Sequence, residues 1–194
     1  MSTTSSASPR GKLWPWLAIS AVIVATTYQL RRQGRRWWCA CRQYTPWWGD
    51  IHSSHNSQHL FDPYSFTHIL HGLVFYGLLA KSTPRLSPAW RLGLATGVEA
   101  LWEVIENSEA VIGRYREATV ALGYHGDTVA NSLGDILSCG AGFVLARRLG
   151  PRGSLVLFTA TELGLLIWIR DNLTLNVVML IHPIEAIKKW QMGQ

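Results

Sequence analysis

Hydrophobic residues along this chain gather in five long apolar stretches that are separated by polar segments. These stretches cover residues 13–30, 65–80, 89–107, 127–145 and 154–169. Each is close to the length of a helix that crosses a bilayer. A further apolar stretch, residues 173–190, is divided by Pro183 and predicts either a short span or a helix at the membrane interface. The pattern predicts an all-α, polytopic transmembrane helix bundle of five or six spans.

Three of the stretches carry polar residues at helical spacing, so that each set lies on one side of its helix. The three stripes are Ser65, His68 and His71; Glu99, Glu103 and Glu106; and Asp127, Asn131 and Asp135. A carboxylate inside a bilayer costs a few kcal/mol, so such residues face a partner or a cavity within the bundle. We therefore expect the three stripes to converge on one buried polar site.

The predicted topology places the ends of several stretches on one membrane face. If spans alternate in direction, residues 31–64 and 109–126 lie on the same side. Polar residues are concentrated at the ends of the stretches on that side, namely His55, His59, Asp62, Glu106, Asn107, His125, Asp127, Arg170, Asp171 and Asn172. This distribution predicts a single site at one face, covered by a structured polar loop between the first and second spans.

Histidines and carboxylates in such a site can activate water or a lipid hydroxyl for attack on a phosphate or acyl group. The catalytic candidates are His59, Asp62, His68, His71, Glu103, Glu106, Asn107, Asp127, Asn131 and Asp135. The substrate-binding candidates are Arg114, Arg116 and Arg170, as phosphate clamps, and Asn56. The sequence has no G-x-S-x-G or H-E-x-x-H motif and no glycine-rich phosphate loop, so the reaction class rests on residue types alone.

Acids concentrated in a low-dielectric environment must be protonated, paired with basic groups or neutralised by a metal. The candidate metal ligands are His68, His71, Glu103, Glu106 and Asp127. A mixed histidine–carboxylate set suits zinc, manganese or iron, and an oxygen-only subset suits magnesium or calcium. The alternative without a metal is that the acids pair with Arg114, Arg116 or Arg170 and share protons.

Composition favours a small membrane protein of one domain, residues 13–194, after a disordered segment at residues 1–12. The 194 residues are 48% hydrophobic and 15% charged, against roughly 25% charged in soluble domains. The ten tryptophans suit membrane interfaces, and the net charge of +6 lies in polar segments that contain no nucleic-acid recognition motif. We expect membrane lipids as partners and no nucleic acid.

The three cysteines do not form a disulfide framework. Cys39 and Cys41 make a C-x-C pair without the second C-x-x-C that would complete a four-cysteine zinc site, and a disulfide across one residue would be strained. A metal or redox role for this pair stays open beside a structural one. Cys139 lies in an apolar stretch and reads as a small core residue.

Three functions are compatible with these features. The first is an enzyme, a membrane-embedded hydrolase or transferase that acts on a lipid or lipid-linked substrate, with or without a divalent metal. The second is a small ion- or proton-coupled transporter, which would favour a polar path through both leaflets; apart from Glu162, the stripes favour one half. The third is an assembly or accessory subunit of a membrane complex, which would tolerate Glu103→Gln because hydrogen bonds can replace charge.

Several motifs together resemble an uncharacterised family of bacterial multi-pass inner-membrane proteins, known as a protein of unknown function. They are Ser54-His55-Asn56-Ser57-Gln58-His59, the stretch from Tyr64 to Gly72, Trp102 to Asn107, Gly126 to Ser132, and Arg170 to Asn176. The resemblance covers about residues 34–191 and implies a bacterial inner-membrane location, without an activity. His55 stands where that family usually has an acidic residue. The shorter pattern Asp127-x-x-x-Asn131-x-x-Gly134 is similar to VanZ-like membrane proteins.

Overall fold

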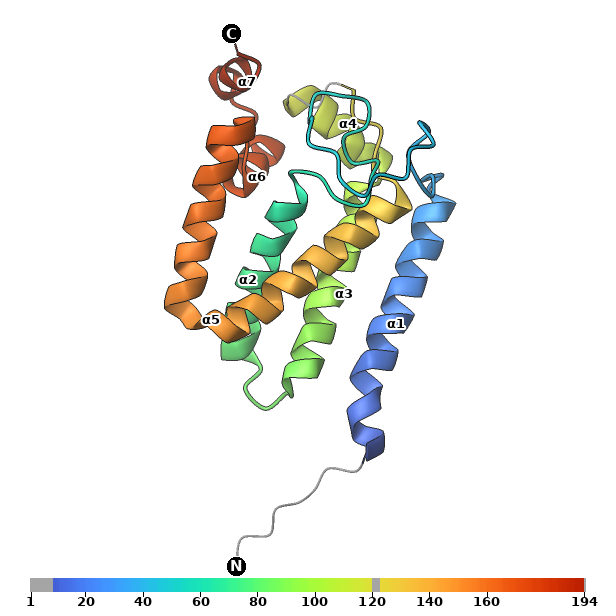
Figure 1. Ribbon diagram of the computed structural model, residues 1–194, viewed down its shortest axis with the longest axis vertical. Coiled ribbons are helices and arrows are strands. Elements are labelled where there is room, and N and C mark those ends of the chain that lie inside the picture. The colour runs from blue at the N-terminus through green and yellow to red at the C-terminus, as the bar shows by residue number, and fades with distance from the viewer. Residues whose placement is uncertain (1–8, 120–122, 194) are drawn as a thin grey trace, which may run out of the picture.

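The computed structural model describes residues 9–119 and 123–193, which form seven helices and no strand (Figure 1). The helices are α1 (Pro9–Arg32), α2 (Ser65–Ser82), α3 (Pro88–Glu106), α4 (Glu109–Ala118), α5 (Val129–Ile169), α6 (Leu173–Ile181) and α7 (Glu185–Gln191). The all-α prediction is confirmed.

The longest element, α5, is a helical hairpin. Its backbone leaves helical geometry at Gly150, where φ is 68° and ψ is −177°, and Pro151 follows. This region of backbone space is open essentially to glycine alone. Residues 129–149 and 151–169 therefore form two arms, which run in opposite directions in Figure 1. They correspond to the fourth and fifth apolar stretches of the sequence.

Helix α2 packs against the α5 hairpin, and the two elements together form an apolar core. Leu70 and Leu73 of α2 are buried with Ala146 of the first arm, and Leu157 and Phe158 of the second arm pack against them. The rings of Tyr76 and Phe143 meet edge to face at 5.1 Å. Helix α3 contacts α2, α5 and α1, so that α1 lies outermost (Figure 1).

Polar residues at the helix starts explain where several helices begin. The side chains of Ser87, Ser108, Thr128 and Asn172 accept hydrogen bonds from the backbone N–H groups of Trp90, Val111, Asn131 and Leu175. Each cap satisfies a donor that the first helical turn leaves unpaired. Three of these starts, those of α4, α5 and α6, are gathered at the upper end of the bundle in Figure 1.

The loop of residues 33–64 folds over that same end (Figure 1). The N–H of Trp48 donates to the Phe61 carbonyl at 3.0 Å, and the N–H of Phe61 donates to the Pro46 carbonyl at 2.8 Å. The N–H of Thr128 donates to the Ser57 carbonyl at 3.0 Å, which ties the loop to the start of α5. The loop is therefore structured, as the sequence predicts.

Three expectations need correction. Residues 9–12, expected to be disordered, belong to α1, while residues 1–8 lie outside the described residues. Residues 173–190 do not form a sixth span, because α6 has 9 residues, about 14 Å of helix, and a break precedes α7. The segment after α3, expected to be a loop, contains α4.

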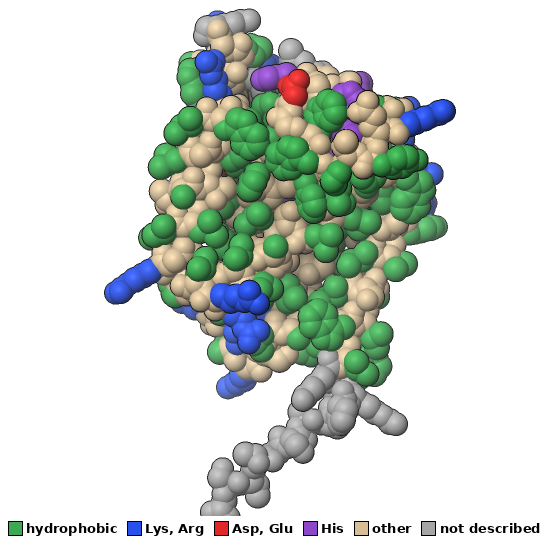
Figure 2. All heavy atoms as spheres, in the orientation of Figure 1, with side chains coloured by type: hydrophobic (Ala, Val, Ile, Leu, Met, Phe, Trp, Pro, Cys, Tyr) green, Lys and Arg blue, Asp and Glu red, His purple; other side chains and the backbone are tan. Residues whose placement is uncertain are grey.

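Two of the described helices, α1 from Leu13 to Arg32 and α5, are long and apolar enough to cross a membrane. The outer surface of the bundle is rich in apolar side chains, and Figure 2 shows them spread over the middle of the visible face. More than half of the surface of Leu78, Val98, Leu101, Leu155 and Ile167 is exposed. Basic side chains lie toward the two ends of the same view.

Candidate functional site

The centre of the site is a carboxylate shared by two histidines. Helix α2 presents His68 and His71 one turn apart, and both face Glu99 of α3, whose side chain is fully buried. His68 Nδ1 lies 2.5 Å from Glu99 Oε1, and His71 Nδ1 lies 3.0 Å from Glu99 Oε2. An Nδ1–H that donates to Glu99 fixes the tautomer of His68 and leaves Nε2 as the nitrogen that can accept a proton.

Two further carboxylates approach His68. Glu103 Oε1 lies 3.6 Å from His68 Nδ1, and Asp135 Oδ2 lies 3.8 Å from His68 Nε2. Asp135 also accepts a 2.8 Å hydrogen bond from the Ser65 hydroxyl. Glu103 is fully buried, and neither of its carboxylate oxygens has a hydrogen-bond partner. A carboxylate in this state must hold a proton or a cation, because an unpaired buried charge costs several kcal/mol.

Asp127 lies between α3 and the start of α5. Its backbone N–H donates to Asn107 Oδ1 at 2.7 Å, and Asn107 Nδ2 donates back to Asp127 Oδ2 at 2.7 Å. The hydroxyl of Tyr124 donates to Asp127 Oδ1 at 2.8 Å. Burial raises the pKa of Asp127 to about 6 despite the hydrogen bonds from Tyr124 and Asn107, which lower it.

A cavity of about 240 Å³ opens beside these groups. Its polar wall includes His68, His71, Glu106, Asp127, Asn131 and Asp135. Its apolar lining comes mainly from α6, with Leu173, Val177, Leu180 and Ile181. No lysine or arginine lines the cavity in the part of the chain that the structure describes. The cavity therefore suits a molecule with a polar end and an apolar end, or a cation at its polar end.

Tyrosines and a second acidic group extend the polar wall. The hydroxyl of Tyr64 donates to Asp171 Oδ2 at 3.1 Å, and that of Tyr115 donates to Asn176 Oδ1 at 3.0 Å. Burial raises the pKa of Asp171 to about 6. Burial also raises the pKa of both tyrosines, and the nearby carboxylates raise it further. These hydroxyls are therefore donors to the site.

Asp62 supports the loop. Its carboxylate accepts hydrogen bonds from the backbone N–H groups of Ser57, Tyr64 and Ser65, at 2.9, 2.7 and 3.3 Å. Burial raises the pKa of Asp62, although these three bonds oppose the rise. The bonds fix the turn that enters α2, so Asp62 positions His68 from a distance and does not line the cavity.

The structure brings together most, though not all, of the candidates. His68, His71, Glu103, Glu106, Asp127, Asn131 and Asp135 converge, Asn107 holds Asp127, and Asn56 lines the cavity mouth. His59 lies apart, in the loop, where its Nε2 is 3.8 Å from Cys41 Sγ. We name His68, His71, Glu99, Glu103, Glu106, Asp127 and Asp135 the polar cluster; His71 and Glu106 are half-buried and the other five are buried.

The three candidate arginines bind backbone carbonyls instead of carboxylates. Arg114 donates to the Leu180 and Ile181 carbonyls at the end of α6, and Arg116 donates to the Tyr124 carbonyl. Arg170 donates to the Trp190 carbonyl of α7. Among the described residues, none of the three forms an ion pair with the polar cluster. The arginines therefore do not supply counter-charge to the polar cluster, and of the metal-free alternative only the sharing of protons among the acids remains.

Four groups of side chains offer ligand atoms that lie within 4.8 Å of one another. Three belong to the polar cluster: His68, His71 and Glu99; His68, Glu103 and Asp135; and Glu103, Glu106 and Asp127. The fourth, Cys39, Cys41, His55 and His59, lies in the loop. Glu103, Glu106 and Asp127 offer only oxygen, which is the ligand set of magnesium, calcium or manganese.

Comparison with known proteins places the chain in a family. Residues 30–193 match the family described as "Protein of unknown function (DUF2585)". The chain belongs to this family. A relative from Paracoccus denitrificans named "UPF0314 protein" is 47% identical over 178 residues, which cover 91% of this chain and 92% of the relative.

Other members of the family are similar over most or all of their length. A "UPF0314 protein" from Sphingopyxis alaskensis is 46% identical and covers 92% of this chain and 95% of its own. One from Brucella anthropi is 39% identical over the whole of both chains. No solved structure matches this chain. The family resemblance seen in the motifs is confirmed, and these matches do not bear on the VanZ-like pattern.

Sequence reasoning missed three kinds of residue in this family member. Glu99 belonged to a predicted stripe, but its central place between His68 and His71 was not anticipated. Tyr64, Tyr115 and Tyr124 are single residues in polar segments, so no periodic signal could have marked them. A metal role for the two cysteines of the loop was left open, but their grouping with His55 and His59 was not anticipated, because a long stretch without regular structure separates them.

Proposed function

We propose that the chain is a multi-pass protein of the bacterial inner membrane with five crossings: α1, α2, α3 and the two arms of α5. Helices α2 and α3 have 18 and 19 residues, about 27 to 29 Å, which matches a hydrocarbon core of about 30 Å. Helix α3 carries three glutamates, and two of them, Glu99 and Glu103, are fully buried inside the bundle. Such a helix can cross a bilayer because its charges do not meet lipid.

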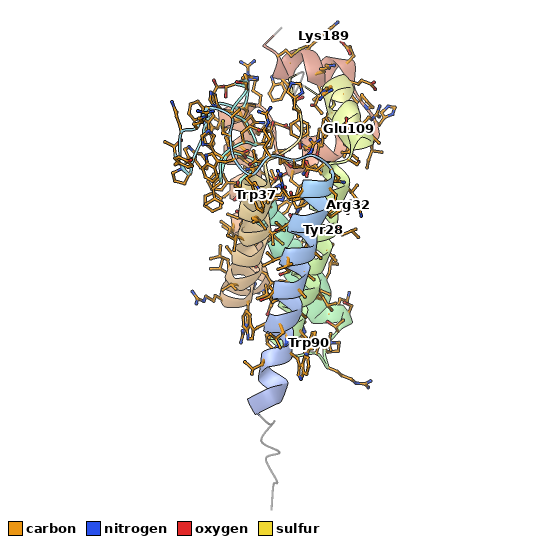
Figure 3. The ribbon with its side chains drawn as sticks, turned by 90° about the vertical axis from the view of Figure 1, so that its right-hand side faces the viewer. Tyr28, Arg32, Trp37, Trp90, Glu109 and Lys189 are labelled. Atoms are coloured by element: carbon orange, nitrogen blue, oxygen red, sulfur yellow. The ribbon has the colours of Figure 1, made fainter. Side chains whose placement is uncertain are left out.

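Aromatic and basic residues at two levels support this placement. Figure 3 shows Tyr28, Arg32 and Trp37 near one end of the helices and Trp90 near the other. The guanidinium of Arg31 lies 5.3 Å from the Trp37 ring centre, and that of Arg32 lies 6.0 Å from the Tyr28 ring centre. Tryptophan, tyrosine and arginine are the residues that anchor spans at the headgroup level.

We further propose that the protein is a metal-assisted hydrolase or transferase that acts on the headgroup of a lipid or lipid-linked substrate. The observation that carries the proposal is the buried carboxylate of Glu103, which accepts no hydrogen bond and is grouped with Glu106 and Asp127 beside the His68–Glu99 pair. An acidic cavity without lysine or arginine repels a phosphate unless a divalent cation neutralises it.

The roles of the side chains follow from their positions. Glu103, Glu106 and Asp127 would hold the cation, which would supply Lewis-acid polarisation of a phosphate or carbonyl oxygen of the headgroup. His68 Nε2 takes the proton from the attacking water or hydroxyl, while Glu99 orients the ring through Nδ1. The substrate's apolar part lies along Leu173, Val177 and Leu180 of α6.

The distribution of polar groups favours this function over a transporter. Glu162 is the acid that the sequence sets apart from the polar stripes near one membrane face. Its carboxylate accepts hydrogen bonds from the N–H groups of Leu173 and Thr174 at 2.9 and 3.2 Å. It therefore caps α6 and does not extend a path toward the opposite face. A carrier needs a polar path through both leaflets, and Glu162 does not contribute to one.

Lipid analysis of a deletion strain tests the proposal. The strain is complemented with the wild-type chain, Glu103→Gln, His68→Gln or the control Glu117→Gln, whose side chain is exposed. We expect one lipid species to accumulate in the deletion strain and to disappear with the wild-type and control genes only. The purified chain in vesicles should convert that species only when magnesium or manganese is present.

Each alternative function gives a different result. Full complementation by Glu103→Gln together with an unchanged lipid profile would support an assembly subunit. An unchanged lipid profile with ion or solute flux into vesicles that contain the wild-type chain would support a transporter. Loss of expression in both variants would assign the polar cluster to folding. Any of these outcomes would overturn the enzymatic proposal.

A further inference from the structure

The loop of residues 33–64 brings two cysteines and two histidines to one point. Cys39 Sγ lies 3.3 Å from His55 Nδ1, and Cys41 Sγ lies 3.8 Å from His59 Nε2. The four ligand atoms all lie within 4.8 Å of one another. Tetrahedral zinc, with Zn–S of about 2.3 Å and Zn–N of about 2.0 Å, places neighbouring sulfur and nitrogen ligands roughly 3.6 Å apart. The observed separations are those of such a site.

We propose that Cys39, Cys41, His55 and His59 form a structural zinc site of the Cys₂His₂ type. The two histidines follow the H-x₃-H spacing of such sites, and the four side chains supply the sulfur and nitrogen ligands that zinc prefers. A structural site is closed by four protein ligands, which is the number present here. This zinc is separate from the cation of the proposed reaction and does not depend on it.

A hydrogen bond at Nδ1 of His59 leaves Nε2, the nitrogen that faces Cys41, free to bind a metal. Its Nδ1 lies 2.7 Å from the carbonyl oxygen of Thr45, so Nδ1 carries the proton and donates it. Nε2, the atom that faces Cys41, is therefore the unprotonated nitrogen with a free lone pair. A carbonyl that accepts from the second nitrogen of a histidine is the usual support of a metal ligand.

Aromatic rings enclose the site. Trp48 stacks on His55 with ring centres 4.2 Å apart and on His59 at 5.1 Å, and its indole N–H donates to the Ser53 hydroxyl at 2.8 Å. Trp38 meets His59 edge to face at 5.9 Å. His59 is fully buried and Cys39 nearly so. The histidine rings are thus held in place before a metal binds, which lowers the entropy lost on binding.

A disulfide, the other explanation for a pair of cysteines, does not fit this geometry. The three cysteines are free thiols, and a disulfide between Cys39 and Cys41 would close across a single residue under strain. Zinc here would join the beginning of the loop to its later part, where Asn56 and Ser57, between His55 and His59, line the cavity. We infer that the zinc fixes the loop over the cavity.

Metal analysis of the detergent-purified full chain tests the site. We expect about one zinc per chain in the wild type and a loss of most of it in Cys39→Ser and His59→Ala. The matched controls are Cys139→Ser, a buried cysteine of α5, and His52→Ala, an exposed histidine of the same loop. Both controls should retain zinc, and so should Glu103→Gln, which separates this site from the proposed catalytic cation.

Cobalt substitution of the wild-type chain keeps the test decisive even if the loop variants fail to fold. Tetrahedral cobalt bound to two thiolates gives intense visible bands and a sulfur-to-cobalt charge-transfer band in the near ultraviolet. These bands should appear with the wild type and with Cys139→Ser. A wild-type chain without zinc, cobalt spectra without the thiolate band, or zinc retained in the Cys39→Ser/His59→Ala double variant would each overturn the proposal.

Discussion

Gly72 of α2 lies against the backbone of α5 at Gly142, and neither residue has room for a side chain. A Cβ atom on Gly72 would lie 2.6 Å from the backbone nitrogen of Phe143, and one on Gly142 would lie 2.8 Å from the carbonyl carbon of Ile69. The two helices therefore approach as closely as their backbones permit. This contact holds α2, which carries His68 and His71, beside the arm that carries Asp135.

Replacing either glycine should separate the helices. We expect Gly72→Ala and Gly142→Ala each to lower stability by roughly 1–3 kcal/mol, the usual cost of overpacking, measured by thermal unfolding in detergent. Gly77→Ala on the same helix is the control, because no atom lies within 4 Å of its added Cβ. It should be neutral or slightly stabilising, since alanine favours a helix. Equal melting temperatures for all three variants would contradict the close contact.

The cap on α6 gives a second prediction. Glu162 bonds the first two N–H groups of α6, so Glu162→Ala should destabilise that helix by about 0.5–2 kcal/mol. Hydrogen exchange at residues 173–181 should accelerate, because the N–H groups of Leu173 and Thr174 lose their acceptor while only the Asn172 cap remains. Exchange in Glu117→Ala should match the wild type. Unchanged protection in Glu162→Ala would show that packing alone holds α6 against the cavity.

The elevated pKa values of Asp127 and Asp171 predict how stability depends on pH. Both are about 6 in the folded chain, against an ordinary value of 3.8. Between these values the folded state binds more protons than the unfolded state at these two groups, so their contribution to stability is fully present below about pH 4 and is lost as the pH rises through about 6. Each group contributes up to about 3 kcal/mol to the change.

Chemical denaturation from pH 4 to pH 7, with a chelator present, measures this dependence. Asp171→Asn should flatten the profile, because the amide does not titrate. Asp50→Asn is the control, since Asp50 is an exposed carboxylate of the loop. Stability that rises across this interval in the wild type would contradict the assignment.

The polar cluster was predictable because two strong constraints act together. Helical periodicity aligned His68 with His71 and Glu99 with Glu103, and the cost of placing charge in an apolar environment required these stripes to face inward. The chain's apolar stretches likewise gave the helices and the break before Pro151. Periodicity and the cost of burying or exposing charge therefore predict the helices and the inward face of each stripe without any knowledge of tertiary contacts.

The loop contacts and the arginine partners were not predictable in the same way. The distance between Cys39 and His55 depends on how a long irregular segment folds, and its Trp48 and Thr45 contacts have no periodic pattern. Arg114 was expected to bind a substrate phosphate or, in the metal-free alternative, to pair with the acids, whereas it donates to the carbonyls at the end of α6. Helix α4 was missed because its polar, arginine-containing sequence has no apolar stretch.

In the proposed arrangement of five crossings, Gly150 determines on which side of the membrane the carboxyl-terminal part of the chain lies. An unbroken helix of the 41 residues of α5 would be about 62 Å long, roughly twice the thickness of a hydrocarbon core. No neighbouring atom crowds Gly150, so its conformation alone requires glycine. A residue that favours helix at this position would send α6 and α7 to the opposite side of the bilayer, and the cavity would lose its apolar wall. A tag after residue 194 would report that inversion.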